Sequence, residues 1–376
     1  MNLPIAPFGE IQITKKSLLQ YVNVHYSVNP ELATVTETNS GTVTQSASAA
    51  VLQSSTDPIG IARLVSRQPA RYLPGQGLLI VFSALYTQGV ASSYQAAGYG
   101  NVTDGLFFEF NGVDFGINRR SSVTGEVVNN RVKLNQFSRL ENIPEFEPTK
   151  YNVYDISLQW LGAGEINFWI ENKHTGVLEV VHTIRYANTN SVLSLINPSL
   201  PLFAQCSNTG NTSNMTLKIG NMAAYAFGDR ELVGPRQAHR TSLAYTTGAE
   251  RTVIAIENMA DVFAGTGNNR SALAPTHITY STDGTKSTTL RVKRCTISGG
   301  TSAAVNATTS IAKQYTGTPT ASNTKLLFSI EAAKADQGTF LIPDDVILAP
   351  GEAIIVTADS TANSDIAVGI SWKELL

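Results

Sequence analysis

The sequence predicts an all-β protein built from two antiparallel β-sandwiches of jelly-roll type. Short apolar or alternating segments of strand length recur along the chain, for example at 77–85, 106–110 and 165–170, with turn-forming residues between them. Helical periodicity sustained over ten or more residues is nearly absent. Only 15% of the residues are charged, and Ser, Thr, Asn and Gly take their place, which is typical of turn-rich β-sandwiches.

Changes in pattern divide the chain into three parts. Residues 1–56 end in a polar, Ser/Thr-rich stretch with little to bury, so we interpret them as an extended N-terminal arm that orders against a neighbour or as a leader without fixed structure. Residues 57–230 carry the strands of a concanavalin- or jelly-roll-like sandwich. Gly, Pro and charged residues cluster at 228–236 and indicate a linker, and residues 231–376 carry a smaller C-terminal β-sandwich.

Two hairpins are expected inside the first sandwich. The segments 151–160 and 165–170 alternate polar with apolar residues, and the glycines of 161–164 suit the connection between them. The same alternation continues into 177–186 after the turn-forming residues 172–176. We therefore expect three neighbouring antiparallel strands.

Charge and hydropathy argue against nucleic-acid and membrane partners. The formal net charge of −2 provides no basic surface for direct contact with phosphate backbones. No apolar stretch approaches the roughly 20 residues that a membrane-spanning helix needs, and no secretory signal is evident. We expect assembly in a host cytoplasm, and we expect Cys206 and Cys295, which fall in different domains, to remain unbridged.

No set of residues predicts catalysis, a metal or a cofactor. The five histidines lack the close spacing of a metal site. Glu165 and Glu171 lie on one strand, and six residues of strand span roughly 20 Å, far more than the roughly 5–9.5 Å of a glycosidase pair. Asp104 and Glu109 have odd spacing, which sends them to opposite faces of a strand. The sequence therefore predicts no enzyme.

Aromatic and basic residues leave two further options for binding. The aromatic side chains either fill the core or stack on sugar rings, and their place in strongly apolar strands favours core filling. Arg119 and Arg120 either bind an acidic partner or form a solvated strand end, and we favour the strand end. The aromatic residues concerned are Tyr94, Tyr99, Phe107, Trp160 and Trp169.

Two sets of motifs occur in order along the chain. Those of the first half are 66–84, 104–112, 115–121, 148–154, 159–168, 182–188, 197–201 and 208–210, and those of the second half are 348–352, 363–365 and 368–372. The first set, between about residues 60 and 228, resembles a recurring virion-protein domain of tailed phages and some large DNA viruses. The second set is similar to a small sandwich at the C-termini of phage head and tail proteins. The resemblance implies a concanavalin- or jelly-roll-like fold and a place in the virion, with no catalytic residues.

The first functional hypothesis is a capsid-associated decoration, cement or head-fibre subunit. Its arm would bind the major capsid protein or another virion protein, and the chain would form a homo-oligomer, most naturally a trimer. The arm residues expected to make contact are Leu18, Leu19, Tyr21 and Val24.

Two other hypotheses remain open. The second places the protein in the tail or baseplate, where the sandwiches recognise host-surface glycans, and aromatic residues gathered on one exposed face would favour it. The third is a polysaccharide-degrading enzyme, which would need two carboxylates in one cleft.

Overall fold

The computed structural model describes residues 15–229, 232–261, 269–316 and 319–375. These residues form antiparallel strands and two short 3-10 helices, η1 (Leu134–Gln136) and η2 (Leu140–Asn142), so the all-β prediction is confirmed. Among them, no helix is long and apolar enough to span a membrane. The chain divides into two compact units, Met1–Arg230 and Glu231–Leu376, which are described separately below.

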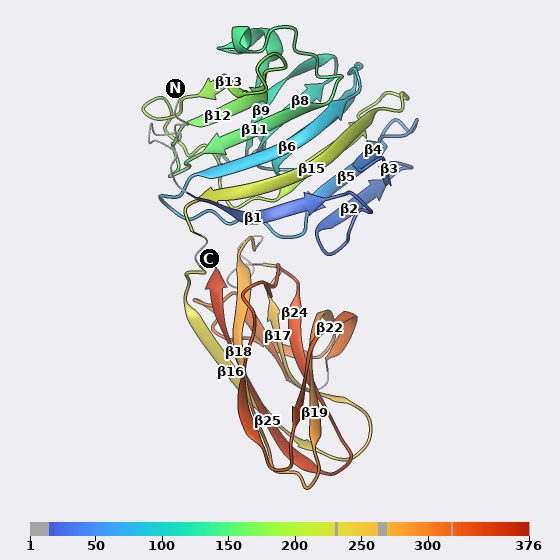
Figure 1. Ribbon diagram of the computed structural model, residues 1–376, viewed down its shortest axis with the longest axis vertical. Helices are drawn as coiled ribbons and strands as arrows, with labels where there is room; N and C mark the ends of the chain where they lie inside the picture. The colour runs from blue at the N-terminus through green and yellow to red at the C-terminus, as the bar shows by residue number, and fades with distance from the viewer. Residues whose placement is uncertain (1–14, 230–231, 262–268, 317–318, 376) are drawn as a thin grey trace. The chain divides into compact units, whose positions relative to one another are not determined.

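Unit 1 is a sandwich of an eight-stranded and a seven-stranded sheet (Figure 1). The first sheet has the order β13-β12-β11-β6-β15-β4-β3, and β1 also pairs with β15. The second has the order β10-β9-β8-β7-β14-β5-β2. The strands of the first sheet are β1 (Lys16–Asn23), β3 (Thr42–Ser46), β4 (Ala49–Gln53), β6 (Leu78–Tyr86), β11 (Asn152–Leu158), β12 (Ile166–Glu171), β13 (Leu178–Ile184) and β15 (Thr216–Phe227). Those of the second are β2 (Ala33–Thr38), β5 (Ile61–Ser66), β7 (Ser93–Gly100), β8 (Gly105–Asn111), β9 (Asp114–Ser121), β10 (Val128–Lys133) and β14 (Leu202–Asn208).

Strand alternation builds the core between these two sheets. On β8, Leu106, Phe108 and Phe110 enter the central apolar cluster, whereas Phe107 belongs to a separate small cluster on the opposite face. From the other sheet, Tyr154 stacks on Phe82 with ring centroids 5.3 Å apart and lies 4.7 Å from the ring of Phe108. Full burial of each such side chain contributes about 2–3 kcal/mol, so this aromatic cluster is a major source of stability.

The expected hairpins are confirmed by the strand register. Tyr154 pairs with Ile170, and Leu158 pairs with Ile166, which makes β11 and β12 antiparallel neighbours. Glu171 then pairs with Leu178 across the turn into β13. The alternation of polar and apolar residues therefore predicted correctly which of these strands pair and in what order.

The predicted N-terminal arm is wrong for the part of residues 1–56 that the structure describes, while residues 1–14 lie outside the described ranges. Strand β1 pairs with β15 from Lys16↔Phe227 to Asn23↔Asn221, and β2 pairs with β5. Strands β3 and β4 form a hairpin whose β4 also pairs with β15. Strands β2 and β3 are edge strands that bury few side chains, so a polar, Thr-rich sequence with high strand propensity suffices to form them.

Unit 2 is a smaller sandwich with a four-stranded sheet, β16-β25-β18-β23, and a six-stranded sheet, β20-β21-β17-β24-β19-β22. Trp372 is the largest fully buried side chain at its centre. The strands are β16 (Arg236–Tyr245), β17 (Arg251–Asn258), β18 (Ala272–Thr282), β19 (Thr288–Ser298), β20 (Thr301–Ala304), β21 (Ala312–Thr316), β22 (Thr320–Ala332), β23 (Gln337–Leu341), β24 (Ala353–Ser360) and β25 (Ser364–Leu375).

A fully buried carboxylate holds one end of this core together. Glu374 accepts hydrogen bonds from the indole Nε1 of Trp372 at 3.1 Å, from the backbone N–H of Ile311 at 3.0 Å and from the hydroxyl of Ser310. Each carboxylate oxygen thus accepts at least one hydrogen bond, as buried polar groups require. These hydrogen bonds link β25 to the residues that begin β21. Cys206 and Cys295 are buried free thiols, one in each unit.

Candidate functional site

The outward face of the eight-stranded sheet of unit 1 is the strongest candidate for a functional surface. In Figure 1 this sheet lies in front of the seven-stranded one and shows its outward face to the viewer, with no further described layer of unit 1 over it. We call its apolar part the outer strip and define it by two rows across the strands. One row runs Leu18, Tyr225, Leu79 and the other Tyr21, Ala223, Val81, Asp155, Trp169.

A β-bulge brings the two most exposed members of the outer strip onto one face. Leu18 and Tyr21 are three residues apart, a spacing that places side chains on opposite faces of a regular strand. The register of β1 shifts between Leu18 and Gln20, so Leu18 faces Tyr225 and Tyr21 faces Ala223. Leu18 and Tyr21 are each 43% exposed.

The structure divides the predicted contact residues into two pairs. Leu18 and Tyr21 lie on the outer strip and are available to a partner. Leu19 packs against the core cluster, and Val24 is completely buried in it. The prediction that Leu19 and Val24 contact a partner is therefore wrong, because both side chains serve the interior of unit 1.

A buried carboxyl group lies in the middle of the outer strip. Asp155 is 5% exposed, and its neighbours across the strands are Val81 and Trp169. Its Oδ1 has no hydrogen-bond partner among the described residues. Burial raises the pKa of Asp155 to about 7; Lys16 opposes this rise, and the negative charge of Glu171 adds to it.

The rest of the outer strip was missed by sequence reasoning. Its signal is the continuous apolar run of β6 at 78–82, where alternation with polar residues would indicate a solvated outer face. Trp169 also belongs to the strip, where its indole Nε1 donates to Ser157 Oγ at 2.9 Å. Of the aromatic residues assigned to the core, Tyr99 is buried there and Trp160 packs against it.

The outward face of the seven-stranded sheet carries a buried polar network instead. Glu109 is 2% exposed, and both of its oxygens are occupied. Oε1 accepts from Arg131 Nε at 2.6 Å, while Oε2 accepts from Tyr94 Oη at 2.8 Å and Asn118 Nδ2 at 3.0 Å. Arg120 in turn donates to Tyr94 Oη at 2.7 Å. Burial and the Glu109 charge raise the pKa of Tyr94 far above its ordinary value.

This network has little room for a substrate. The hollow beside Glu109 and Arg131 has a volume of about 50 Å³, close to the space of one or two water molecules. The other carboxylate lining it, Asp114, is paired with Lys133 at 2.8 Å. Both carboxylates that line the hollow are thus already paired with basic side chains, an arrangement that supports structure rather than proton transfer.

Arg119 and Arg120 do not form the expected solvated strand end. Arg120 is 8% exposed and lies over the rings of Tyr94 and Phe107. Arg119 donates to the carbonyl of Ser194 at 2.7 Å, and its guanidinium lies 5.0 Å from the ring centroid of Tyr186. Sequence reasoning missed these contacts because they join segments far apart in the chain.

The other acidic residues considered for chemistry have structural contacts. Asp104 is buried and accepts from the hydroxyl of Ser122 at 2.7 Å and the backbone N–H of Ile196 at 3.1 Å. Glu165 lies 3.7 Å from Arg185. Across the described parts of both units, no group of three or more His, Cys, Asp or Glu side chains is arranged to hold a metal.

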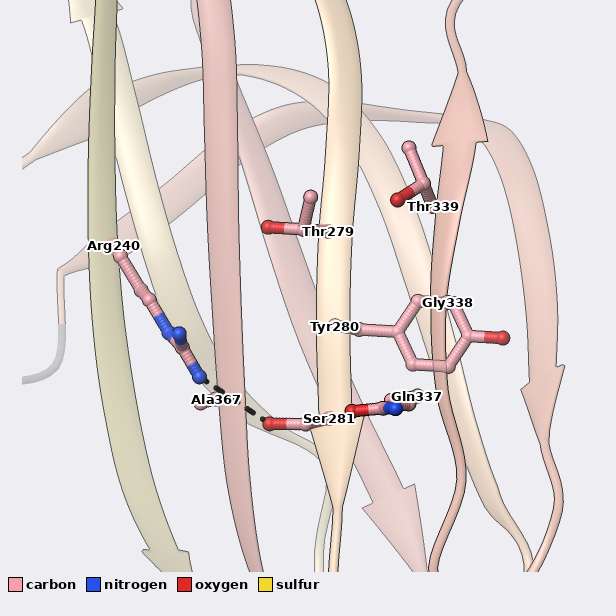
Figure 2. A pocket seen from close by; sticks show the side chains of 8 residues that line it. All are labelled: Arg240, Thr279, Tyr280, Ser281, Gln337, Gly338, Thr339 and Ala367. Carbon is pink, nitrogen blue, oxygen red and sulfur yellow. Dashed lines mark hydrogen bonds between the residues drawn. The ribbon is translucent and has the colours of Figure 1, made fainter.

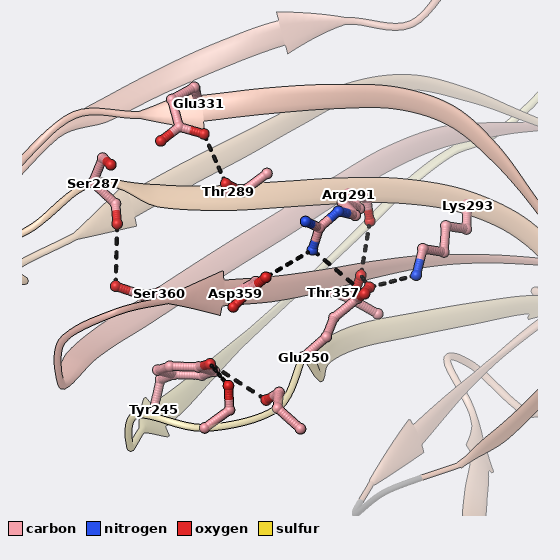
Figure 3. Close-up of polar contacts among 12 residues, drawn as sticks. Tyr245, Glu250, Ser287, Thr289, Arg291, Lys293, Glu331, Thr357, Asp359 and Ser360 are labelled. Atoms are coloured by element: carbon pink, nitrogen blue, oxygen red, sulfur yellow. Dashed lines mark hydrogen bonds and ion pairs between the residues drawn. The ribbon is translucent and has the colours of Figure 1, made fainter.

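Unit 2 presents a charged cluster on its six-stranded sheet (Figure 3). Arg291 lies 3.4 Å from Glu250 and 3.3 Å from Asp359, and Lys293 also pairs with Glu250. Thr357 donates its hydroxyl to Glu250. Partly exposed ion pairs of this kind contribute at most about 1 kcal/mol each, so the cluster is a modest stabilising feature.

Comparison with known proteins places the chain in no family, since neither a family model nor a curated protein matches it. Solved structures similar to it include one from a study of endo-acting O-glycanases that human gut microbiota express to initiate mucin breakdown, at 11% identity and a TM-score of 0.42, covering 57% of this chain and 100% of that chain. The catalytic domain of an endo-1,3-β-glucanase from Thermotoga petrophila matches at 12% identity and a TM-score of 0.38, covering 57% and 98%. The Emp47p carbohydrate recognition domain matches at 9% identity and a TM-score of 0.36, with the same coverage. Likenesses at this level carry no argument about what this chain binds or does.

Proposed function

We propose that this chain is a non-enzymatic structural protein of a phage particle, a capsid-associated decoration, cement or head-fibre subunit. It attaches through the outer strip of unit 1. The observation that carries the proposal is the two rows of apolar side chains, with Leu18 and Tyr21 exposed, on a sheet face that no described element of unit 1 covers. Contiguous exposed apolar surface marks interaction sites on soluble proteins.

The partner is expected to be another virion protein or a second copy of this chain. The outer strip is flat and strand-built, so it suits a broad contact in which Tyr21 and Trp169 fill shallow depressions of the partner surface. Burial of the strip on assembly would stabilise the particle, because a ligand specific to the assembled state shifts the equilibrium toward it. The resemblance of residues 60–228 to virion proteins supports the same assignment.

The hydrogen bonds that enclose the Glu109 carboxylate support a role without catalysis. Glu109 is enclosed by Arg131, Asn118 and Tyr94, so neither of its oxygens is presented to a substrate. A glycosidase needs one carboxyl group to donate a proton and another to act as nucleophile or base. The face that holds Glu109 supplies neither.

Localisation in intact particles tests the proposal. Gold-labelled antibody against residues 240–376 is applied to the particles and viewed by electron microscopy. Label spread over the head is the expected result. Label confined to the tail tip would contradict attachment to the capsid, and particles without any label would contradict a place in the virion.

A binding assay then tests the outer strip itself. Particles that lack the protein are mixed with purified chain and sedimented. The double variant Leu18→Ser/Tyr21→Ser is expected to lose most of its cosedimentation. Tyr26→Ser is the matched control, because Tyr26 is 96% exposed and lies outside the strip. Equal binding of the two variants would refute the strip as the attachment surface.

A second candidate function is recognition of host-surface glycans by a tail or baseplate protein. It is favoured by a polar hollow on the four-stranded sheet of unit 2, which is lined by hydroxyl, amide and guanidinium groups (Figure 2). Antibody label at the tail tip, together with saccharide binding by the purified chain, is the result expected for this function.

A further inference from the structure

The outward face of the four-stranded sheet in unit 2 presents polar side chains in register across its strands. Arg240 on β16 pairs with Gly369 on β25, Gly369 pairs with Thr279 on β18, and Thr279 pairs with Thr339 on β23. Directly paired residues place their side chains on the same face, about 4.8 Å apart from strand to strand. The next row supplies Ser281 and Gln337, which are paired in the same way. Figure 2 shows these side chains gathered over the sheet.

Small residues on the central strand make this face hollow. Ala367 and Gly369 lie between the taller side chains of β16 and β18. The larger hollow, which Ala367 lines, has a volume of about 430 Å³. Gly369 lines a neighbouring hollow of about 210 Å³, which shares Arg240 and Thr279 with the larger one. A Cβ atom at Gly369 would lie 2.7 Å from Thr279 Oγ1, so glycine keeps this neighbouring part of the floor open. Volumes of this size accommodate one or two sugar rings.

The lining of the larger hollow is rich in neutral hydrogen-bonding groups. Thr279, Ser281 and Thr339 supply hydroxyls, each of which both donates and accepts, and Gln337 supplies an amide that does the same. Thr279, Gln337 and Thr339 are exposed, so their polar groups are presented to solvent. A ligand that carries many hydroxyl groups matches this lining better than an apolar one.

Arg240 gives the hollow its charge. It is the only charged residue among the eight that line the cavity. Among the described residues, the Arg240 guanidinium makes a long contact of 3.4 Å to Ser281 Oγ, which lays it beside Ala367 on the floor. Arg291 in the same unit has two carboxylate partners, whereas the residues lining this hollow offer Arg240 none. Asp365 lies two residues before Ala367 on β25, and Asp336 accepts a hydrogen bond at 3.3 Å from Tyr280, which lines the hollow.

We propose that this hollow binds a saccharide that carries a carboxylate, such as a uronic acid unit. The Arg240 guanidinium pairs with the carboxylate through two parallel N–H···O bonds, a geometry that guanidinium and carboxylate groups favour. Thr279, Ser281, Thr339 and Gln337 exchange hydrogen bonds with ring hydroxyls. This inference rests on the second proposed function and names its ligand class and its site.

Binding of small saccharides to the purified full-length chain tests the proposal. Digalacturonate is titrated into the protein by ligand-detected NMR, and a galactose disaccharide serves as the neutral probe. We expect a dissociation constant on the order of 1 mM for digalacturonate, because the hollow is open to solvent. Binding of the neutral disaccharide should be at least about tenfold weaker, since it lacks the charge-assisted pair.

Two variants distinguish binding at this hollow from nonspecific attraction of the ligand to positive charge. Arg240→Gln is expected to weaken digalacturonate binding at least about tenfold. Arg236→Gln is the matched control, because Arg236 lies on the same strand and the same face but does not line the hollow. Ala367→Phe fills the floor and should abolish binding, with thermal unfolding used to show that unit 2 remains folded.

Each outcome decides between the inference and the function on which it rests. Equal loss in Arg240→Gln and Arg236→Gln would overturn the site. Equal binding of the neutral disaccharide would leave glycan recognition standing and overturn the acidic ligand class, while no binding of either saccharide would overturn both. Binding of a polyglutamate peptide as tightly as digalacturonate would assign the hollow to acidic protein segments instead.

Discussion

Asp155 on β11 lies directly opposite Trp169 on β12, and its carboxyl group is buried within the apolar outer strip. A free aspartate ionises near pH 3.9, whereas the pKa of Asp155 is raised to about 7 in the folded chain. Between these pH values the unfolded chain releases a proton that the folded chain retains. The contribution of Asp155 to the free energy of unfolding of unit 1 therefore falls as the pH rises from about 4 to about 7 and levels off above that.

Asp155→Asn should remove this pH dependence. At pH 8 we expect the variant to unfold at a higher temperature than the natural chain, with a gain of about 1–3 kcal/mol, while near pH 4 the two should be equally stable. Calorimetry at a series of pH values measures the difference. Glu126→Gln, the same change at an exposed site of unit 1, is the control. A gain that is constant with pH would show that ionisation of Asp155 is not its source.

Substitutions at the four residues predicted to contact a partner should differ in how much they destabilise unit 1. Val24→Ser leaves a cavity and an unpaired hydroxyl in the core and should destabilise unit 1 by about 2–4 kcal/mol. Leu18→Ser changes an exposed side chain and should stay within about 0.5 kcal/mol of the natural chain. Urea unfolding measures both. Similar losses in the two variants would mean that Leu18 is as deeply packed as Val24.

The polar network around Glu109 should be sensitive to loss of its one carboxylate. Glu109→Leu removes the acceptor of the buried Tyr94 hydroxyl and Asn118 amide and breaks the ion pair with Arg131, and we expect a loss of about 3–5 kcal/mol from unit 1. Urea unfolding again gives the measurement, and Glu126→Leu provides an exposed reference within about 0.5 kcal/mol of the natural chain. A small effect at Glu109 would imply that water replaces its contacts.

Glu374 offers a test of whether the two units unfold separately. Glu374→Leu removes the acceptor of Trp372 Nε1 and of the Ile311 N–H, and should destabilise unit 2 by about 2–4 kcal/mol. Hydrogen exchange, read by mass spectrometry, reports each unit of the same molecule. Faster exchange confined to residues 232–375 is expected, and equal acceleration in unit 1 would contradict independent folding.

The sequence predicted the strands whose side chains alternate cleanly between core and solvent. The hairpins joining β11, β12 and β13 followed from that alternation, because strand period and hydrophobic period coincide there. Strands β2 and β3 escaped prediction because these edge strands draw their stability from pairing with β5 and β4 rather than from apolar side chains of their own. Their Ser/Thr-rich sequence is equally compatible with a chain that has no fixed structure.

The candidate surfaces depended on features that no local pattern reveals. The bulge after Leu18 decides which residues of β1 reach the outer strip, and nothing in the sequence of 16–24 indicates it. The hollow around Arg240 requires four strands from separate parts of the chain to align in one register. Long-range pairing of this kind is fixed only when the whole sheet forms.

The pairing of β1 with β15 has a consequence for synthesis on the ribosome. Residues 16–23 emerge early, yet their partner residues 221–227 are translated some two hundred residues later. Until then, Val22 and Val24 have no core to enter, and the nascent segment is exposed to chaperones and to neighbouring nascent chains. The pairing of β1 with β15 is therefore a late step in the co-translational folding of unit 1. The rate of translation up to residue 227 sets how long residues 16–24 stay exposed.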